Sequence, residues 1–209
     1  MYIPKHFEET DREVLHALIR SHPLGAWVTI SAAGLLVNHI PFLLSAADGT
    51  HGTLVGHVAR ANPVWQSFSA TEPSVVIFQE AESYISPSWY PSKREHGKVV
   101  PTWNYAVVHA HGIPRAIEDP TWLLDHVTRL SAEHESQQLL PWRVTDAPRD
   151  YIDKLLGAIV GIEIPVQALV GKWKVSQNRP RPDRDGVVAG LEMKADARAQ
   201  EMASLISQR

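Results

Sequence analysis

The sequence predicts a mainly β protein of the α+β class, built around a small antiparallel barrel. Short apolar runs separated by Gly-, Asp- and Pro-rich turns follow one another from about residue 25 to residue 117, which is typical of antiparallel strands. Helical periodicity precedes these runs and returns from about residue 118. With 209 residues and 44% hydrophobic content, the chain can bury a core of its own.

The N-terminal part predicts a helix followed by strands. Thr10 is a suitable N-cap for a helix over residues 11–21, where apolar residues recur at helical spacing. Three strands are expected over residues 25–59, because Ala-Ala-Gly and Ala-Asp-Gly-Thr-His-Gly separate three apolar runs. Asn62 and Pro63 then predict the start of a helix of about two turns.

The remaining elements follow in order. We expect a buried strand at "SVVIFQEA", an aromatic loop at "ESYISPSWYPSKREHGK", and a strand from residue 98 to "IPRAI". Asp119 and Pro148 begin two helices, "VGIEIPVQALVGKWKV" returns as a strand, and a helical tail covers about 187–208. The expected organisation is one domain over 1–180, with helices inserted at about 118–158, and a dependent helical tail over 181–209.

Composition excludes several classes of function. The chain has no cysteine, so disulfides, thiolate metal sites and thiol catalysis are excluded. Its net charge of −3 lacks the basic surplus of a nucleic-acid-binding protein. The sequence has no export signal and no apolar run of about 18 residues, so we expect a cytoplasmic protein without a membrane partner. No nucleophile elbow, P-loop or dinucleotide fingerprint is present, and no residue is assigned a catalytic role.

The stretch "KVVPTWNYAVVHAHG" carries wide rings on one face of its predicted strand. Strand alternation puts Trp103, Tyr105, His109 and His111 on the same side. Two histidines on one face could chelate a metal, but no third ligand is evident, so no metal is expected. The rings indicate either a planar ligand or a Tyr- and Trp-rich dimer interface.

Two further stretches carry candidate ligands for an anion. In "GHVARANP", His57 and Arg60 come at a strand end directly before a helix, an arrangement that can bind phosphate; the alternative is an exposed Arg beside a capped helix. His39 lies on a strand expected to neighbour that of His57, although a hydrogen-bonded core His would give the same pattern. "GKWKVSQNRPRP" concentrates basic side chains around a Trp, which suits nucleic acid, phosphate, an acidic partner or a solvated linker.

Five segments in order, "MYIPKHF", "GHVARANPVW", "SYISPSWY", "VPTWNY" and "SQNRP", resemble the PaiB-type family of transcriptional regulators within the flavin-binding split-barrel superfamily. This resemblance covers residues 1 to about 180. It implies a homodimeric antiparallel split barrel, with flanking helices and FMN bound at the subunit interface.

The resemblance also implies the cofactor-binding residues. The FMN phosphate would be bound by His57, Arg60 and Asn62. The isoalloxazine would meet Asn38, His39, Trp103, Asn104 and Tyr105. A late segment of the partner subunit would close the site with Lys172, Trp173, Gln177 and Arg179. "HVARAN" supplies a single Arg, which predicts weak FMN binding or none in the purified protein.

The predicted function is therefore that of an FMN-binding homodimer acting as a negative transcriptional regulator. The alternative is a flavin-dependent oxidoreductase or a haem-handling split-barrel protein, with His39, His57, His109 and His111 as candidate haem contacts. Direct DNA binding ranks lowest, since no helix-turn-helix is legible and only "KWKVSQNRPRPDR" is basic.

Overall fold

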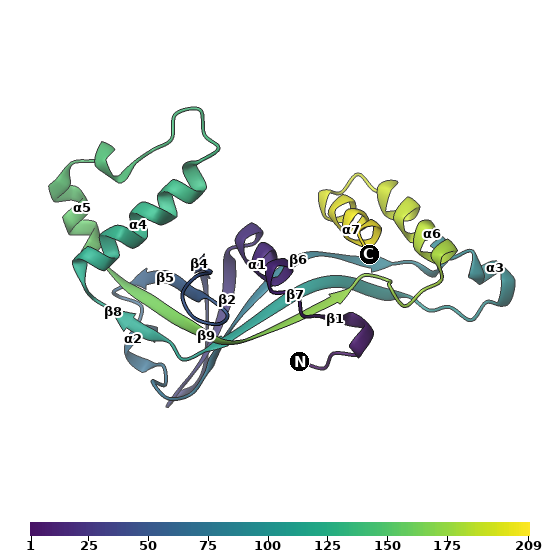
Figure 1. Ribbon diagram of the computed structural model, residues 1–209, viewed down its shortest axis with the longest axis horizontal. Helices are drawn as coiled ribbons and strands as arrows, with labels where there is room; N and C mark the ends of the chain where they lie inside the picture. Colours follow the sequence, from purple (N-terminus) through teal and green to yellow (C-terminus); the bar gives the residue numbers. More distant parts are fainter. The chain divides into compact units, whose positions relative to one another are not determined.

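The computed structural model describes all 209 residues, as nine strands, seven α-helices and three short 3₁₀ helices (Figure 1). The strands are β1 (Glu8–Glu9), β2 (Leu24–Ser31), β3 (Gly34–Pro41), β4 (Leu43–Ser45), β5 (Thr53–Ala59), β6 (Ser74–Ile85), β7 (Thr102–Gly112), β8 (Arg115–Ile117) and β9 (Ile159–Lys174). The α-helices are α1 (Arg12–Ser21), α2 (Val64–Ser67), α3 (Ser92–His96), α4 (Pro120–Glu135), α5 (Arg149–Leu156), α6 (Arg181–Glu192) and α7 (Ala197–Ser207). The 3₁₀ helices are η1 (Lys5–Phe7), η2 (Pro87–Trp89) and η3 (Val144–Asp146). None of the helices is both long and apolar enough to span a bilayer.

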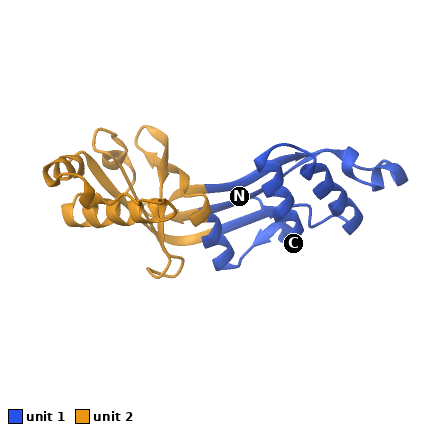
Figure 2. Ribbon diagram, turned by 90° about the horizontal axis from the view of Figure 1, so that it is seen from above, with its two compact units in different colours: residues 1–18, 78–109, 170–209 blue, residues 19–77, 110–169 orange.

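The strands form one sheet in the order β3-β2-β6-β7-β9-β5-β4, and β9 also pairs with β1 and β8. The β2–β3, β5–β9 and β4–β5 pairs are antiparallel. The chain divides into two compact units, which Figure 2 distinguishes by colour. Unit 1 comprises residues 1–18, 78–109 and 170–209; unit 2 comprises residues 19–77 and 110–169. The long strands β6, β7 and β9 contribute residues to both.

Unit 2 is built on the strands β2 to β5 and one part of β9. Its core includes Trp27, which is fully buried and whose indole N–H donates to Ser74 Oγ at 3.0 Å. The Ser74 hydroxyl in turn donates to the Gly112 carbonyl at 3.1 Å, so the polar atoms that accompany this ring into the core have partners.

The helices α4 and α5 complete unit 2. As predicted, Asp119 caps α4, because its carboxylate accepts a hydrogen bond from the Trp122 main-chain N–H at 2.7 Å. The two helices enclose an apolar cluster of Leu123, Val144, Ile152 and Leu156.

Unit 1 contains the C-terminal helices α6 and α7, which pack against each other (Figure 1). The segment expected to be a loop after about residue 81 contains the end of β6, then η2 and α3, and its part after β6 is fixed on α6. Gly190 lets the Trp89 ring approach the helix so closely that a Cβ at that position would lie 2.4 Å from it. Asp183, buried on the same helix, accepts hydrogen bonds from the Ser92 main-chain N–H and hydroxyl, at 3.1 and 2.7 Å.

The expected mainly β architecture is confirmed, but several boundaries were wrong. Four strands occupy residues 24–59, because the chain leaves the ladder around Phe42 and separates β3 from β4. The helix after Asn62 has a single turn. The strand expected to run to residue 117 is broken after Gly112, so β8 is separate. The tail forms two helices, and α6 already begins at Arg181, because prolines are compatible with a first helical turn.

Candidate functional site

Alternation predicted that Trp103 and Tyr105 share one face of β7, and in the structure both are more exposed than Asn104 between them. Trp103 is 51% exposed and Tyr105 is half-buried, whereas Asn104 between them is 1% exposed. The Asn104 amide donates to Ser176 Oγ at 2.8 Å, within unit 1. Ser176 has a φ of 64°, an uncommon backbone conformation for a non-glycine residue, at the turn that follows β9. Asn104 therefore ties β7 to this turn.

A second aromatic ring accompanies Trp103. The rings of Tyr84 and Trp103 meet edge to face, with their centroids 6.1 Å apart. Tyr84 is 43% exposed, so both rings remain open to a ligand or to another protein surface.

Three partly or largely buried cations lie at the end of β9 and in the turn after it. The Lys172 ammonium donates to the Tyr2 carbonyl at 3.2 Å and lies 5.2 Å from the centre of the Tyr105 ring. The Lys174 ammonium donates to the Thr102 hydroxyl and to the Trp103 carbonyl.

Arg179, the third cation, lies over the ring of Tyr90, 4.9 Å from its centre. Burial, together with the positive charges of Lys172 and Arg179, lowers the pKa of Lys174. No carboxylate pairs with any of the three cations. This part of unit 1 therefore carries uncompensated positive charge beside exposed rings, a combination suited to an aromatic ligand that bears an anionic group.

Two other predicted site residues shape the same segment from within. Trp173 is buried, at 4% exposure, and the Arg209 guanidinium lies 5.8 Å from its ring centre. The Gln177 amide donates to the Trp173 carbonyl and accepts from the Val175 N–H at 2.8 Å. The Gln177 side chain thus holds the turn that carries Arg179.

Unit 2 holds the other predicted group, and there Arg60 makes three hydrogen bonds within its own chain. Its guanidinium donates to the carbonyls of Gly157 and Ile159, at 2.8 and 3.1 Å, and pairs with the Glu118 carboxylate at 2.6 Å. These contacts join the end of β5 to the start of β9 and are typical of a structural arginine. A role in phosphate binding stays a prediction.

Asn38 on β3 and Asn62 in the turn after β5 contact each other, although β3 and β5 are not paired in the sheet, so the expectation that the strands of His39 and His57 are neighbours was wrong. The Asn62 amide donates to the Asn38 side-chain oxygen at 2.8 Å, and its own oxygen accepts from the Val64 N–H at 3.0 Å. His39, the next residue on the edge strand β3, is exposed. Both asparagine side chains are therefore held in place, with His39 beside them.

His57 bonds to a histidine that the sequence did not single out. Its Nδ1 lies 3.0 Å from Nε2 of His126 on α4, and Trp122 stacks on the His126 ring with 5.3 Å between centroids. Burial lowers the pKa of both histidines, that of His126 to about 4. Both rings are therefore neutral at pH 7, and this pair links the barrel strand β5 to α4.

The histidine pair of β7 is half-buried, and burial lowers the pKa of His111. No group of three or more His, Asp or Glu side chains is placed to hold a metal ion.

The residues predicted to bind the cofactor did not include Lys174, Glu118 or His126. Lys174 stood in the basic stretch already noted. His126 follows Trp122 by one helical turn, so helical spacing could have placed it on a shared face. Nothing local pairs it with His57, 69 positions away.

Residues 1–168 match the sequence profile of FMN_bind_2, described as "Putative FMN-binding domain". An uncharacterized protein of Emericella nidulans is 33% identical over 244 aligned residues, covering 100% of this chain and 97% of that protein. The protease synthase and sporulation protein PAI 2 of Bacillus subtilis is 32% identical over 206 aligned residues, covering 99% and 96% of the two chains.

Solved structures share the fold at low sequence identity. The flavocytochrome Anf3 of Azotobacter vinelandii superposes with a TM-score of 0.58 at 12% identity, over 82% of this chain and 72% of the other. An FAD- and haem-binding protein of Mycobacterium smegmatis also gives 0.58, at 15% identity, over 88% and 80%. These likenesses confirm the expected split-barrel fold. Together with the profile match and the full-length relatives, they lead to one assignment: the chain belongs to the FMN_bind_2 family of split-barrel flavin-binding domains, the PaiB-type family that its motifs resemble.

Proposed function

We propose that this protein binds FMN through the ring-and-cation surface of unit 1, formed by Trp103, Tyr105, Lys172, Lys174 and Arg179. The observation that carries the proposal is the presence of three cations without a carboxylate partner next to an exposed indole. A phosphate dianion compensates such charge through charge-assisted hydrogen bonds, and an isoalloxazine offers a planar surface to the rings.

We thus expect the FMN phosphate to bind to this surface and not, as the sequence alone predicted, to Arg60. Each nitrogen of the Arg60 guanidinium already donates one hydrogen bond, so a phosphate there would compete with the Glu118 carboxylate for the same group. The cations of unit 1 need no such exchange of carboxylates. The effect of Arg60 on flavin binding is tested separately, and flavin contacts of Asn62, Asn38 and His39 stay predictions.

We further propose that the protein acts as a homodimer. Support comes from the hairpin of β2 and β3, which exposes four large apolar side chains on the edge of the sheet. These are Leu24, Ile30, Leu35 and Val37, between 48% and 71% exposed. An exposed apolar group of this kind is typical of a protein–protein interface.

The proposed biological role is regulatory. Support comes from the PaiB-type motifs and from the full-length similarity to PAI 2 of Bacillus subtilis, which is named for protease synthesis and sporulation. If redox chemistry accompanies this role, the flavin supplies it, and the protein positions the ring and tunes its surroundings.

The test of flavin binding compares FMN, riboflavin and FAD by flavin fluorescence and by the shift of the melting temperature. If the cations bind the phosphate, FMN binds more tightly than riboflavin, which lacks it. FAD measures whether the site accepts a longer nucleotide. Absence of binding by all three would refute the proposal, and the visible spectrum of the purified protein would reveal a haem instead.

Variants locate the phosphate. Lys174→Gln and Arg179→Gln should each weaken FMN binding by about 10- to 100-fold, the equivalent of a lost hydrogen bond between charged groups, and leave riboflavin binding nearly unchanged. Arg181→Gln is the matched control, since Arg181 lies two residues after Arg179 in the chain, its side chain is 91% exposed and it pairs with Asp185. Equal FMN affinity in all three variants would place the phosphate elsewhere.

A further inference from the structure

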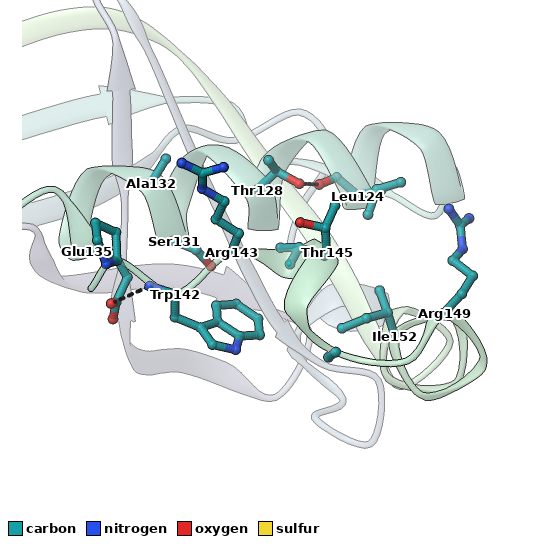
Figure 3. Close-up of a pocket in the computed structure, with 13 residues that line it drawn as sticks. Leu124, Thr128, Ser131, Ala132, Glu135, Trp142, Arg143, Thr145, Arg149 and Ile152 are labelled. Carbon is teal, nitrogen blue, oxygen red and sulfur yellow. Dashed lines mark hydrogen bonds between the residues drawn. The ribbon is translucent and has the colours of Figure 1, made fainter. Parts of the chain in front are cut away.

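The helical part of unit 2 contains a pocket that the flavin proposal does not use. It lies between α4, the loop after it, η3 and the start of α5, with a volume of about 810 Å³ (Figure 3). Small-molecule sites have volumes of about 300–1,000 Å³, so this pocket has the size of a ligand site. None of its lining residues belongs to the ring-and-cation surface.

The walls are mainly apolar. Leu124 and Ala132 contribute from α4, Ile152 from α5, and Trp142 and Val144 from the segment between the helices. The indole of Trp142 is 43% exposed, although it lines the pocket. An apolar guest would remove this surface from water, which stabilises the complex by about 25 cal/mol for each Å² buried.

Three polar side chains of the pocket already have partners. The Thr128 hydroxyl donates to the Leu124 carbonyl of its own helix at 2.7 Å. The Glu135 carboxylate accepts from the main-chain N–H of Trp142 at 3.0 Å. Arg149 pairs with Asp153 at 2.8 Å. These groups do not call for a ligand.

Arg143 differs from them. Its main-chain N–H donates to the Asp146 carboxylate, but its guanidinium has neither an ion pair nor a hydrogen bond. Arg143 lines the pocket together with Ala132 and Thr128, and all three are labelled in Figure 3. One unpaired cation therefore lines a mainly apolar pocket.

We propose that this pocket binds a small amphipathic carboxylate, with the apolar body between α4 and α5 and the carboxylate on Arg143. A guanidinium matches a carboxylate in shape as well as charge, because it can donate two parallel hydrogen bonds. The single free cation selects a monoanion over a neutral or cationic molecule of the same length.

Decanoate is the probe, with decanol and decyltrimethylammonium as its uncharged and cationic counterparts. Isothermal titration calorimetry of the full chain should give binding of decanoate that is at least tenfold tighter than that of either counterpart. The fluorescence of Trp142 should change on binding, and Trp142→Phe identifies its share of the signal. Absence of binding at millimolar decanoate, or equal binding of all three probes, overturns the proposal.

Two arginine variants form a matched pair. Arg143→Gln should reduce the affinity for decanoate about tenfold, to the level of decanol, whereas Arg149→Gln should change it less than twofold because Arg149 already has a partner. Arg143→Lys should restore part of the affinity. The reverse order of the two Gln variants would contradict the role of Arg143.

A third variant tests the apolar body. Ala132→Leu adds side-chain volume to the pocket at an exposed helical position, where folding should tolerate it, and circular dichroism checks this. It should weaken decanoate and decanol alike. Excess FMN should leave decanoate binding unchanged, and competition between FMN and decanoate would show that the pocket belongs to the flavin site instead.

Discussion

The buried His57–His126 pair predicts that the protein loses stability as the pH falls below 7. His126 is 2% exposed, its Nδ1 has no hydrogen-bond partner, and its Nε2 shares a hydrogen bond with His57. A single proton, on either His57 Nδ1 or His126 Nε2, is enough for the hydrogen bond between the two rings. A second proton would place an unpartnered N–H donor and a charge inside the protein, which is why folding disfavours the charged ring.

The size of the effect follows from the pKa of His126. Burial is the main cause that lowers this pKa from 6.5 to about 4; the charges of His57 and Arg129 lower it further, and Asp125 acts in the opposite direction. Between these two values the unfolded chain binds a proton that the folded chain does not, so stability falls with decreasing pH. The loss relative to pH 7 is about 2 kcal/mol at pH 5 and about 3 kcal/mol at pH 4.

The assay is urea unfolding, followed by circular dichroism at pH 7, 6 and 5 and at one protein concentration. His126→Gln cannot titrate, and its amide can still contact His57, so this variant should lose about 2 kcal/mol less than the native protein between pH 7 and pH 5. The comparison uses the change of unfolding free energy with pH, so a loss of stability that is the same at every pH does not affect it.

His134→Gln is the matched control, since His134 is an exposed residue on the same helix. Its pH dependence should follow that of the native protein. The reasoning is refuted if His126→Gln retains the native slope, or if the control flattens the slope as much.

Two further predictions concern stability. Gly190→Ala should lower the unfolding free energy by about 1–3 kcal/mol, since the new Cβ overlaps the Trp89 ring. Gly157→Ala should be nearly neutral, because its Cβ would lie 3.5 Å or more from its neighbours, and thermal unfolding of the two variants tests this difference. Arg60→Gln should cost about 1–2 kcal/mol because the Glu118 ion pair and two carbonyl contacts are lost, and should leave FMN affinity unchanged; a parallel fall in FMN affinity would restore Arg60 as a phosphate ligand.

Local patterns predicted the type of most elements. Alternation along β7 placed Trp103 and Tyr105 on one face and Asn104 on the other, and burial follows that division. Asp119 at the start of α4 was legible because a cap acts within one turn of its own residue. Boundaries were less legible, as at α6, which begins at Arg181 with Pro182 in its first turn, whereas the helical tail was expected from about residue 187.

Pairings between distant residues were decided by the tertiary structure. The sequence identified Arg60 and His57 as residues with chemistry to offer, but the partners Glu118 and His126 lie 58 and 69 positions away. Which side chain meets them depends on the register of β5 against β9 and on how α4 packs, and neither is encoded in a local period.

The sequence by itself determined the fold class, the family resemblance and the rings on one face of a strand, because each follows from residues close together in the chain. Only the tertiary structure decided that Arg60 is engaged in an ion pair while Lys172, Lys174 and Arg179 are not. The reason is physical: whether a cation is free for a ligand depends on which carboxylates reach it after folding, and distance in space, not in sequence, sets that.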